Sequence, residues 1–471
     1  MGCGASKTDQ PNGGEAPTSP PKKEESKPAP AAAPVEEKKE EAPAAAPVEE
    51  KKEEAAAAPA AEEAAPAAAA GESEEGDAFP WAGELNEFPE LPEDCHSLLK
   101  KCLTKEVFEE LKDKKTASGF TLKGCVNSGV QNPDSGVGVY GGDEESYSTF
   151  GALFDPLIEA YHGHTKDAQH TRDLDSDKIP DEPLDEKNEF IISTRVRVGR
   201  NIKDMPLAPL ISKAQRKEVE KRVTESLSTF EGDLAGKYYS LESLSEEERK
   251  QLIDDHFLFK EGDRFLAAAG ANRDWPSGRG IFHNDNKTFL VWVNEEDQLR
   301  IISMEKGGGI KSVFSRLCNA IKEMESKIEF AFNDHLGNIS SCPTNLGTAM
   351  RASVHIKLPL LASHKEELDA IADKYKVQIR GIHGEHSSTD GGIFDISNRR
   401  RLGLSEVECV QSMYEGVQAM IARERELQAE QGGSGEEEKK EEEAAPAEEE
   451  KKEEEAAPAE EEKKEEEAAS D

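Results

Sequence analysis

The sequence predicts an α+β protein in which a small all-helical domain precedes a larger α/β domain on an antiparallel sheet with flanking helices. Apolar residues recur at helical spacing between residues 84 and 175. From Phe190 onward, short runs rich in β-branched and aromatic residues alternate with helical stretches. Both ends of the chain have low-complexity sequence. These observations divide the chain into a folded region of two domains between two disordered tails.

The two tails are residues 1–83, rich in Pro, Ala, Glu and Lys, and residues 431–471, which repeat EEEKKEEEAAPA. Neither can bury enough apolar surface to offset the entropy of ordering, so both are expected to be disordered. Residues 436–471 carry 18 Glu and one Asp against six Lys, a third of the net charge of −39. Because phosphate backbones repel such acidity, no nucleic-acid partner is expected.

The first residues, MGCGASK, predict lipid attachment. Gly2 followed by Ser6 fits the pattern for N-myristoylation, and Cys3 is a candidate for palmitoylation. Two acyl chains anchor a protein stably where one does not. The chain has seven cysteines, an odd number, and neither a signal peptide nor a membrane-spanning apolar stretch. We expect a core in reducing cytosol, held on the cytoplasmic face of a membrane, for instance in a cilium or flagellum, and otherwise cytoplasmic.

The helical domain is expected over residues 84–175. Its first helices are indicated by apolar residues at intervals of three and four: Leu98, Leu99, Leu103, Val107, Phe108 and Leu111. A polar, acidic stretch at 176–189 reads as a linker to the second domain, 190–430.

The second domain contains predicted strands at 190–200 (FIISTRVRVGR), 288–293 (TFLVWV) and 299–304 (LRIISM). A further strand is expected where Arg351, Ser353 and His355 alternate with apolar residues. From about Ser405, apolar residues at intervals of three and four predict a long helix.

Arginines at these strands predict a binding site for a polyanion. Arg195 and Arg197 are two residues apart and project from one face of a strand, Arg300 and Arg351 begin strands, and Arg380 ends one. Forked guanidinium donors suit phosphate oxygens. No Walker A sequence or protein-kinase catalytic loop is present, and GVGVYG at 136–141 lacks the strand and helix of a dinucleotide site. The alternative for each arginine alone is a surface salt bridge.

The stretch SCPTNLGTAMRASVHIKLP, residues 341–359, resembles the active-site signature of the phosphagen kinases, which transfer a phosphoryl group between ATP and a guanidino compound. Other segments, among them DSGVGVYGGDEESY, WPSGRGIFHND and RGIHGEHSSTD, are similar to members of this family that act on arginine. The resemblance extends from about Glu84 to Glu430. One departure is His383, where many such enzymes carry Arg, and a second is Ala349, a variable position.

The resemblance implies a role for each matching residue. The catalytic residues would be Glu296, Cys342 and Glu385, and Asp134 with Arg264 would tether the domains when they close. The ATP site would comprise Ser193, Thr194, Arg195, Val196, Arg197, His256, Arg300, Arg351, Ala352, Ser353, Val354, His355, Arg380, Gly381, Ile382, His383, Gly384 and Glu385. The guanidino substrate would meet Ser135, Gly136, Val137, Gly138, Val139 and Tyr140, together with Glu296, Cys342 and Glu385.

The reaction so implied is reversible, in-line phosphorylation of L-arginine by ATP. Mg²⁺ would arrive with the nucleotide, because no dedicated metal site is evident. A Cys342 thiolate, if cationic surroundings stabilise it, would add a third anionic contact to the substrate guanidinium. The core is expected to be monomeric. Two alternatives stay open: a kinase for taurocyamine or lombricine, and an inactive, membrane-anchored scaffold.

Overall fold

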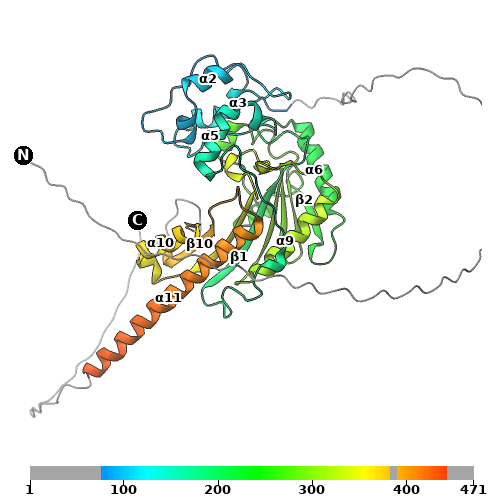
Figure 1. Cartoon of the computed structure of the whole chain (residues 1–471). Helices are drawn as coiled ribbons and strands as arrows, with labels where there is room; N and C mark the ends of the chain where they lie inside the picture. Colours follow the sequence, from blue (N-terminus) through cyan, green and yellow to red (C-terminus); the bar gives the residue numbers. More distant parts are fainter. Residues whose placement is uncertain (1–75, 382–389, 443–471) are drawn as a thin grey trace, which may run out of the picture. The chain divides into compact units, whose positions relative to one another are not determined.

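The computed structural model describes residues 76–381 and 390–442, with side chains of the last helix described as far as residue 431. A helical part comes first and a part built on a sheet follows (Figure 1). The predicted fold class is confirmed: the large sheet is antiparallel and helices flank it. Within the described residues, no helix combines the length and the apolar character needed to span a membrane.

The helical part is built from short helices, three of which have first turns capped by hydroxyl side chains. Ser97, Thr104 and Thr121 each accept a hydrogen bond from a backbone N–H in the first turn of their helix. Its core is apolar, with Leu99 and Phe108 almost fully buried. The helices are α1 (Leu98–Cys102), α2 (Lys105–Leu111), α3 (Leu122–Gln131), α4 (Ser146–Thr149) and α5 (Gly151–His162).

The sheet has eight strands in the order β2-β3-β4-β5-β1-β8-β10-β9, so the first strand of the sequence lies at its centre. The strands are β1 (Ile191–Arg200), β2 (Gly236–Ser240), β3 (Gly280–Asn284), β4 (Phe289–Val293), β5 (Leu299–Lys306), β8 (Met350–Lys357), β9 (Val377–Arg380) and β10 (Ile393–Asn398). A separate two-stranded ribbon pairs β6 (Phe332–Asn333) with β7 (Gly337–Asn338).

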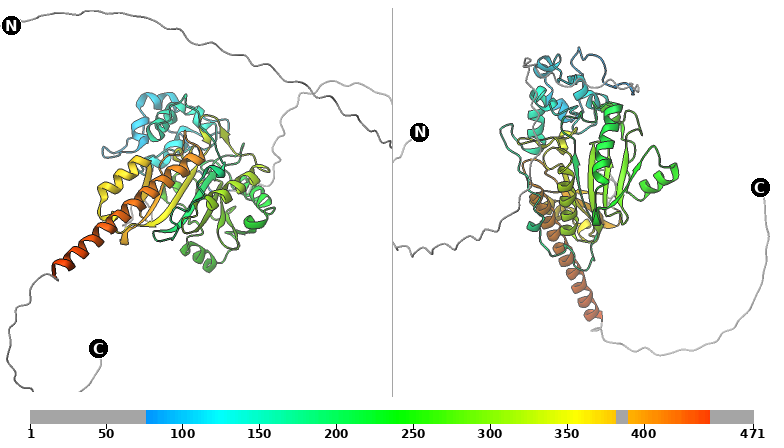
Figure 2. Two further views of the ribbon diagram at one scale, coloured as in Figure 1. Left: turned by 60° about the horizontal axis from the view of Figure 1, so that its bottom comes forward. Right: turned by 90° about the vertical axis from the view of Figure 1, so that its right-hand side faces the viewer.

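Helices cover one face of the sheet. Figures 1 and 2 show α9 and α11 lying across it, where they pack on β1, β5, β8 and β10. Val196 and Val198 of β1 and Val354 of β8 point into this layer and are fully buried. The helices of this part are α6 (Lys213–Leu227), α7 (Glu246–Asp254), α8 (Arg264–Ala269), α9 (Ile310–Glu325), α10 (Lys365–Tyr375) and α11 (Glu406–Glu442). Single 3₁₀ turns occur at η1 (Ser176–Lys178), η2 (Gly232–Leu234), η3 (Pro343–Asn345), η4 (Leu361–Ser363) and η5 (Asp390–Gly392).

Structure extends past both predicted boundaries of the folded region. Trp81, expected in the disordered tail, is buried. Helix α11 continues to Glu442, beyond the expected boundary at 430. Gln, Glu and Lys favour helix, and no proline interrupts the sequence before Pro446. The linker at 176–189 also packs on the sheet part, because Asp185 is buried and accepts from the backbone N–H groups of Phe190 and Ile191.

Candidate active site

The uncovered face of the central strands gathers the predicted arginines. In the register of the sheet, Arg197 of β1 lies opposite Arg351 of β8, and Arg300 of β5 lies opposite Gly199 of β1. Arg195, two residues before Arg197, stacks its guanidinium on the ring of Trp292 at 5.5 Å. Strand pairing therefore brings arginines from distant parts of the sequence together on one cationic surface.

This crowding of like charge perturbs the arginines themselves. Burial and the neighbouring Arg351 lower the pKa of Arg195 to about 10. Burial, Arg300 and Arg195 lower the pKa of Arg197 well below its ordinary value. Among the residues that the structure describes, the Nε atoms of Arg195 and Arg351 are buried without a hydrogen-bond partner. A polyanion would relieve both the repulsion and the missing hydrogen bonds.

Alternation along the strands decides which predicted residues can offer a side chain here. Arg195, Arg351, Ser353 and His355 share the uncovered face. Thr194, Val196, Ala352 and Val354, which the resemblance placed in the same site, are buried on the opposite, helix-covered side. Thr194 donates its hydroxyl hydrogen bond there, to the carbonyl of Gly307 at 2.7 Å. Only every second residue of these runs can thus meet a ligand through its side chain.

Asp395 of β10 is a site residue that the sequence reasoning missed. It pairs with His355 and Arg380 in the register of the sheet, and its Oδ2 accepts from Arg351 Nη2 at 2.7 Å. His355 Nε2 lies 3.8 Å from the same oxygen. Although burial raises it, the nearby His355 and the hydrogen bond and positive charge of Arg351 bring the pKa of Asp395 down to about 2. The carboxylate therefore holds Arg351 in place as a fixed counter-charge.

Glu296 lies at the turn between β4 and β5, where Arg300 holds it. Arg300 Nη2 contacts Glu296 Oε2, while Arg300 Nε bonds Glu295 Oε2 at 2.9 Å. Burial raises the pKa of Glu296. Although burial alone lowers it, the two glutamates hold the pKa of Arg300 above its ordinary value. A predicted phosphate ligand and a predicted substrate ligand are thus paired with each other.

Cys342 begins a 3₁₀ turn beside this pair. Ser341 Oγ donates to the carbonyl of Glu296 at 3.2 Å, which brings the cysteine next to the glutamate, and Cys342 Sγ lies 3.1 Å from Thr344 Oγ1. Burial and the charge of Glu296 raise the pKa of Cys342 to about 12. Burial and the anionic Glu296 therefore both favour the neutral thiol over the thiolate that cationic surroundings would stabilise.

The predicted substrate loop, residues 135–140, is anchored on the helical part and ends beside Cys342. The backbone N–H of Leu99 donates to the Val137 carbonyl, and that of Gly141 donates to the Ser341 carbonyl at 2.8 Å. Gly138 has φ +78°, and a β-carbon there would lie 2.9 Å from the Cα of Gly129, so only glycine fits. Burial first, and then Cys342 and Glu296, raise the pKa of Tyr140. The loop, the thiol and the glutamate therefore form one wall.

The remaining predicted residues lie around this centre or outside the described region. Arg264 Nη1 donates to Asp134 Oδ1 at 2.9 Å, so the expected tether pair is in contact. His256 is exposed in the loop after α7. Ile382, His383, Gly384 and Glu385 lie outside the described residues, as do the predicted lipidation sites Gly2 and Cys3.

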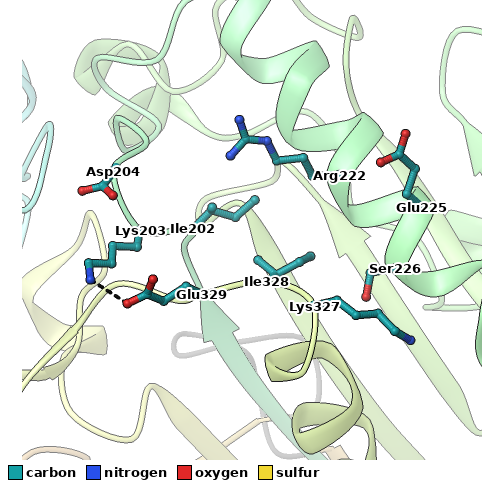
Figure 3. Close-up of a pocket in the computed structure, with 9 residues that line it drawn as sticks. All are labelled: Ile202, Lys203, Asp204, Arg222, Glu225, Ser226, Lys327, Ile328 and Glu329. Carbon is teal, nitrogen blue, oxygen red and sulfur yellow. Dashed lines mark hydrogen bonds and ion pairs between the residues drawn. The ribbon is translucent and has the colours of Figure 1, made fainter. Parts of the chain in front are cut away.

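A cavity of about 420 Å³ lies apart from these residues, between α6 and the segments that follow β1 and α9 (Figure 3). Several of its charged groups pair with neighbouring charges: Lys203 pairs with Glu329 at 2.6 Å, and Arg222 pairs with Glu218 at 2.8 Å. Exposed pairs of this kind contribute little free energy and leave few groups to recognise a ligand. We assign no role to it.

Comparisons with known proteins agree on one family. Residues 93–159 match the N-terminal domain of the ATP:guanido phosphotransferases, and residues 218–427 match their C-terminal catalytic domain. An arginine kinase from Penaeus vannamei, Lit v 2, is 54% identical over 339 residues, covering 72% of this chain and 95% of the relative. An arginine kinase from Anthopleura japonica is 57% identical over 349 residues, but the chain spans only 49% of it.

Solved structures with similar folds carry other substrate names. The duplicated taurocyamine kinase from Schistosoma mansoni, solved with transition-state analogue components, superposes with a TM-score of 0.67 at 44% identity. That match covers 70% of this chain and 46% of the taurocyamine kinase. A lombricine kinase superposes with a TM-score of 0.68 at 38% identity, covering 71% of this chain and 93% of that one.

Proposed function

The chain belongs to the ATP:guanido phosphotransferase family, and we propose that it transfers a phosphoryl group reversibly between ATP and L-arginine. The observation that carries the proposal is the separation of charge at the site. Arg195, Arg197 and Arg351 make one side cationic and suited to a polyphosphate, whereas Glu296 beside Cys342 makes the adjoining wall suited to a guanidinium.

In the proposed reaction the γ-phosphoryl group passes directly from ATP to a guanidino nitrogen, with no phosphoenzyme. As the nitrogen–phosphorus bond forms, the bond from phosphorus to the ADP oxygen breaks, and the proton of that nitrogen passes to a carboxylate of the site or to solvent. Arg195, Arg197 and Arg351 donate hydrogen bonds to phosphate oxygens and stabilise the charge that develops there. Mg²⁺ arriving with the nucleotide would neutralise further phosphate charge.

In the proposed reaction, Arg300 has to exchange its glutamate partners for a phosphate group of the nucleotide. Its guanidinium is paired with Glu295 and Glu296. A phosphate that draws Arg300 away leaves Glu296 free to pair with the substrate guanidinium and to aim one nitrogen at phosphorus. Glu385 is the proposed second carboxylate. Closure of the two domains over the site would exclude the water that otherwise hydrolyses ATP.

The choice of L-arginine rests on the high identity to two arginine kinases and on the substrate loop 135–140, whose glycine at 138 permits close backbone approach. Taurocyamine and lombricine are the alternative substrates, because kinases named for them share the fold. A coupled assay of ADP formation should give the highest kcat/KM with L-arginine within a panel that also contains taurocyamine, lombricine and creatine.

Each outcome of this assay is informative. Equal or better turnover of creatine would refute the proposed specificity, and a preference for taurocyamine or lombricine would replace it. No turnover with any member of the panel would favour the inactive scaffold instead.

Membrane attachment is a separate proposal that rests on the sequence MGCGASK. Myristate on Gly2 gives marginal binding by itself, and palmitate on Cys3 makes the attachment stable. Fractionation of cells expressing wild type, Gly2→Ala and Cys3→Ser tests it. Wild type should sediment with membranes and both variants should move to the soluble fraction; an equal distribution of all three would contradict the anchor.

A further inference from the structure

Residues 77–82, here called the N-terminal strap, are tied to the sheet part by a reciprocal pair of aspartates. The backbone N–H of Asp77 donates to Asp274 Oδ1, and the backbone N–H of Asp274 donates to Asp77 Oδ2, both at 2.6 Å. Arg216 Nη1 bonds the other oxygen of Asp274 at 2.7 Å, with both side chains 2% exposed. Because hydrogen bonds to charged groups are stronger than those between neutral groups, these contacts fix the strap against the segment that follows α8.

The strap covers the C-terminal end of α8. Gly270 caps that helix with φ +88°, and a β-carbon there would lie 3.2 Å from Pro80 Cδ and 3.3 Å from Trp81 Nε1. Arg273 donates from Nε to the Gly270 carbonyl at 3.0 Å and stacks on the Phe79 ring at 3.9 Å. The strap therefore holds the end of α8 through direct packing and through Arg273.

The same strap also contacts the helical part. The Trp81 ring meets the Phe120 ring edge-on at 5.0 Å, while its Nε1 donates to the Pro209 carbonyl at 3.2 Å. Lys123 Nζ donates to the carbonyl of Ala82 at 2.7 Å. Six residues of chain thus join the two parts of the molecule at α8.

Helix α8 in turn holds the region that leads into the substrate loop. Asn127 and Ser128 of α3 donate to the carbonyls of Ala268 and Phe265, at 2.7 and 2.8 Å. At the other end of α8, Arg264 donates to Asn132 at 3.0 Å and pairs with Asp134, just before Ser135. Helix α8 is therefore held at its C-terminal end by the strap and at its N-terminal end by Asn132 and Asp134, which precede the substrate loop.

We propose that Asp77 is a positioning residue, which keeps α8 in register with α3 and so presets residues 135–140 for the guanidino substrate. This inference rests on the proposed function. Asp77 acts on substrate binding and not on nucleotide binding, because among the described residues none of the strap's contacts involves Arg195, Arg197 or Arg351. Loss of the Asp77 carboxylate should therefore raise KM for the guanidino substrate and leave KM for ATP unchanged.

The test compares Asp77→Ala with Glu84→Ala in the full chain. Glu84 is an exposed control nearby, whose carboxylate accepts from Asn86 Nδ2 at 3.2 Å. Asp77→Ala should raise KM for L-arginine three- to tenfold, with KM for ATP and kcat within twofold of wild type. Asp77→Asn should restore most of the wild-type KM, because an amide oxygen can still accept from the Asp274 N–H.

A double-mutant comparison with the Asp134–Arg264 tether distinguishes a positioning role of Asp77 from general destabilisation of the protein. In an Asp134→Ala background, where the contact to Arg264 is already lost, Asp77→Ala should add less than twofold to KM. Equal effects in both backgrounds, a parallel rise in both KM values, or an Asp77→Ala variant with wild-type kinetics would overturn the proposal.

Hydrogen exchange keeps this inference separate from the proposed function. If the wild type turns over no guanidino compound, the proposed function fails. Hydrogen exchange then still tests whether the strap holds α8 in place. Backbone amides of α3 and α8 should then exchange at least threefold faster in Asp77→Ala than in Glu84→Ala. Equal exchange in the two variants would show that the strap does not hold α8.

Discussion

Neutralising Asp395 offers the sharpest test of how the cationic face is held together. Asp395 is 9% exposed and accepts from Arg351 at 2.7 Å, with His355 Nε2 3.8 Å away. Asp395→Asn keeps the size of the side chain and removes its charge. Arg351 then remains buried among like charges without its counter-charge, which costs free energy of folding.

The magnitude follows from the pKa of Asp395, which the nearby His355 and the hydrogen-bonded Arg351 bring to about 2 despite burial. Against an unfolded value near 3.9, this corresponds to about 2 to 3 kcal/mol of folding free energy. Because the folded pKa is the lower one, the contribution is complete above about pH 4 and is lost as pH falls toward 2. At pH 7, Asp395→Asn should lose this entire contribution to the folding free energy.

Urea unfolding and thermal melts at pH 7 measure the effect. Asp373→Asn is the matched control, because Asp373 pairs with Arg399 at 2.9 Å but is 70% exposed, so its loss should cost less than about 0.5 kcal/mol. ADP should raise the Tm of Asp395→Asn more than that of wild type, since its phosphates replace the missing charge. A variant as stable as the Asp373 control would refute the reasoning.

Three further predictions concern the same site. Arg351→Ala should lower kcat by about 10²- to 10³-fold, because a phosphate-directed charge acts mainly in the transition state, and near-normal turnover in the coupled assay would exclude that role. Cys342→Ala should retain measurable turnover, since the thiol lies beside Glu296 and forms no covalent bond to substrate; complete inactivity with an intact fold would contradict this. Burial lowers the pKa of His162, whose Nε2 lies 2.8 Å from the Pro343 carbonyl, to about 4, so its contribution to stability is full above about pH 6.5 and is lost as pH falls toward 4. His162→Gln should flatten the decline of Tm over that range, and an unchanged slope would argue against it.

Much of the site was predictable because the relevant pattern is local. Alternation along FIISTRVRVGR and MRASVHIK determines that Arg195 and Arg197, and likewise Arg351 and His355, share a strand face, whatever the rest of the chain does. The same alternation excludes Val196 and Val354 from that face. The resemblance that named these runs as a site did not make this distinction.

Contacts between distant segments could not be predicted in this way. Asp395 reaches Arg351 only because β10 pairs with β8, and Asp77 meets Asp274 across 197 residues of sequence. An isolated Asp in FDISN or GDAF carries no signal that it will meet a particular partner. A weak signal for the strap existed in the aromatic residues Phe79 and Trp81, which are out of place in a tail rich in Ala and Glu.

The sequence by itself determined the fold class, the family and which side chains share a strand face, because periodicity and motif spacing are properties of neighbouring residues. The tertiary structure decided the pKa shifts and pairings at the site: Arg300 on Glu296, a raised pKa at Cys342, and a lowered pKa at Asp395. Those depend on burial and on which strands become neighbours, and both arise only when the chain has folded and water has left the site.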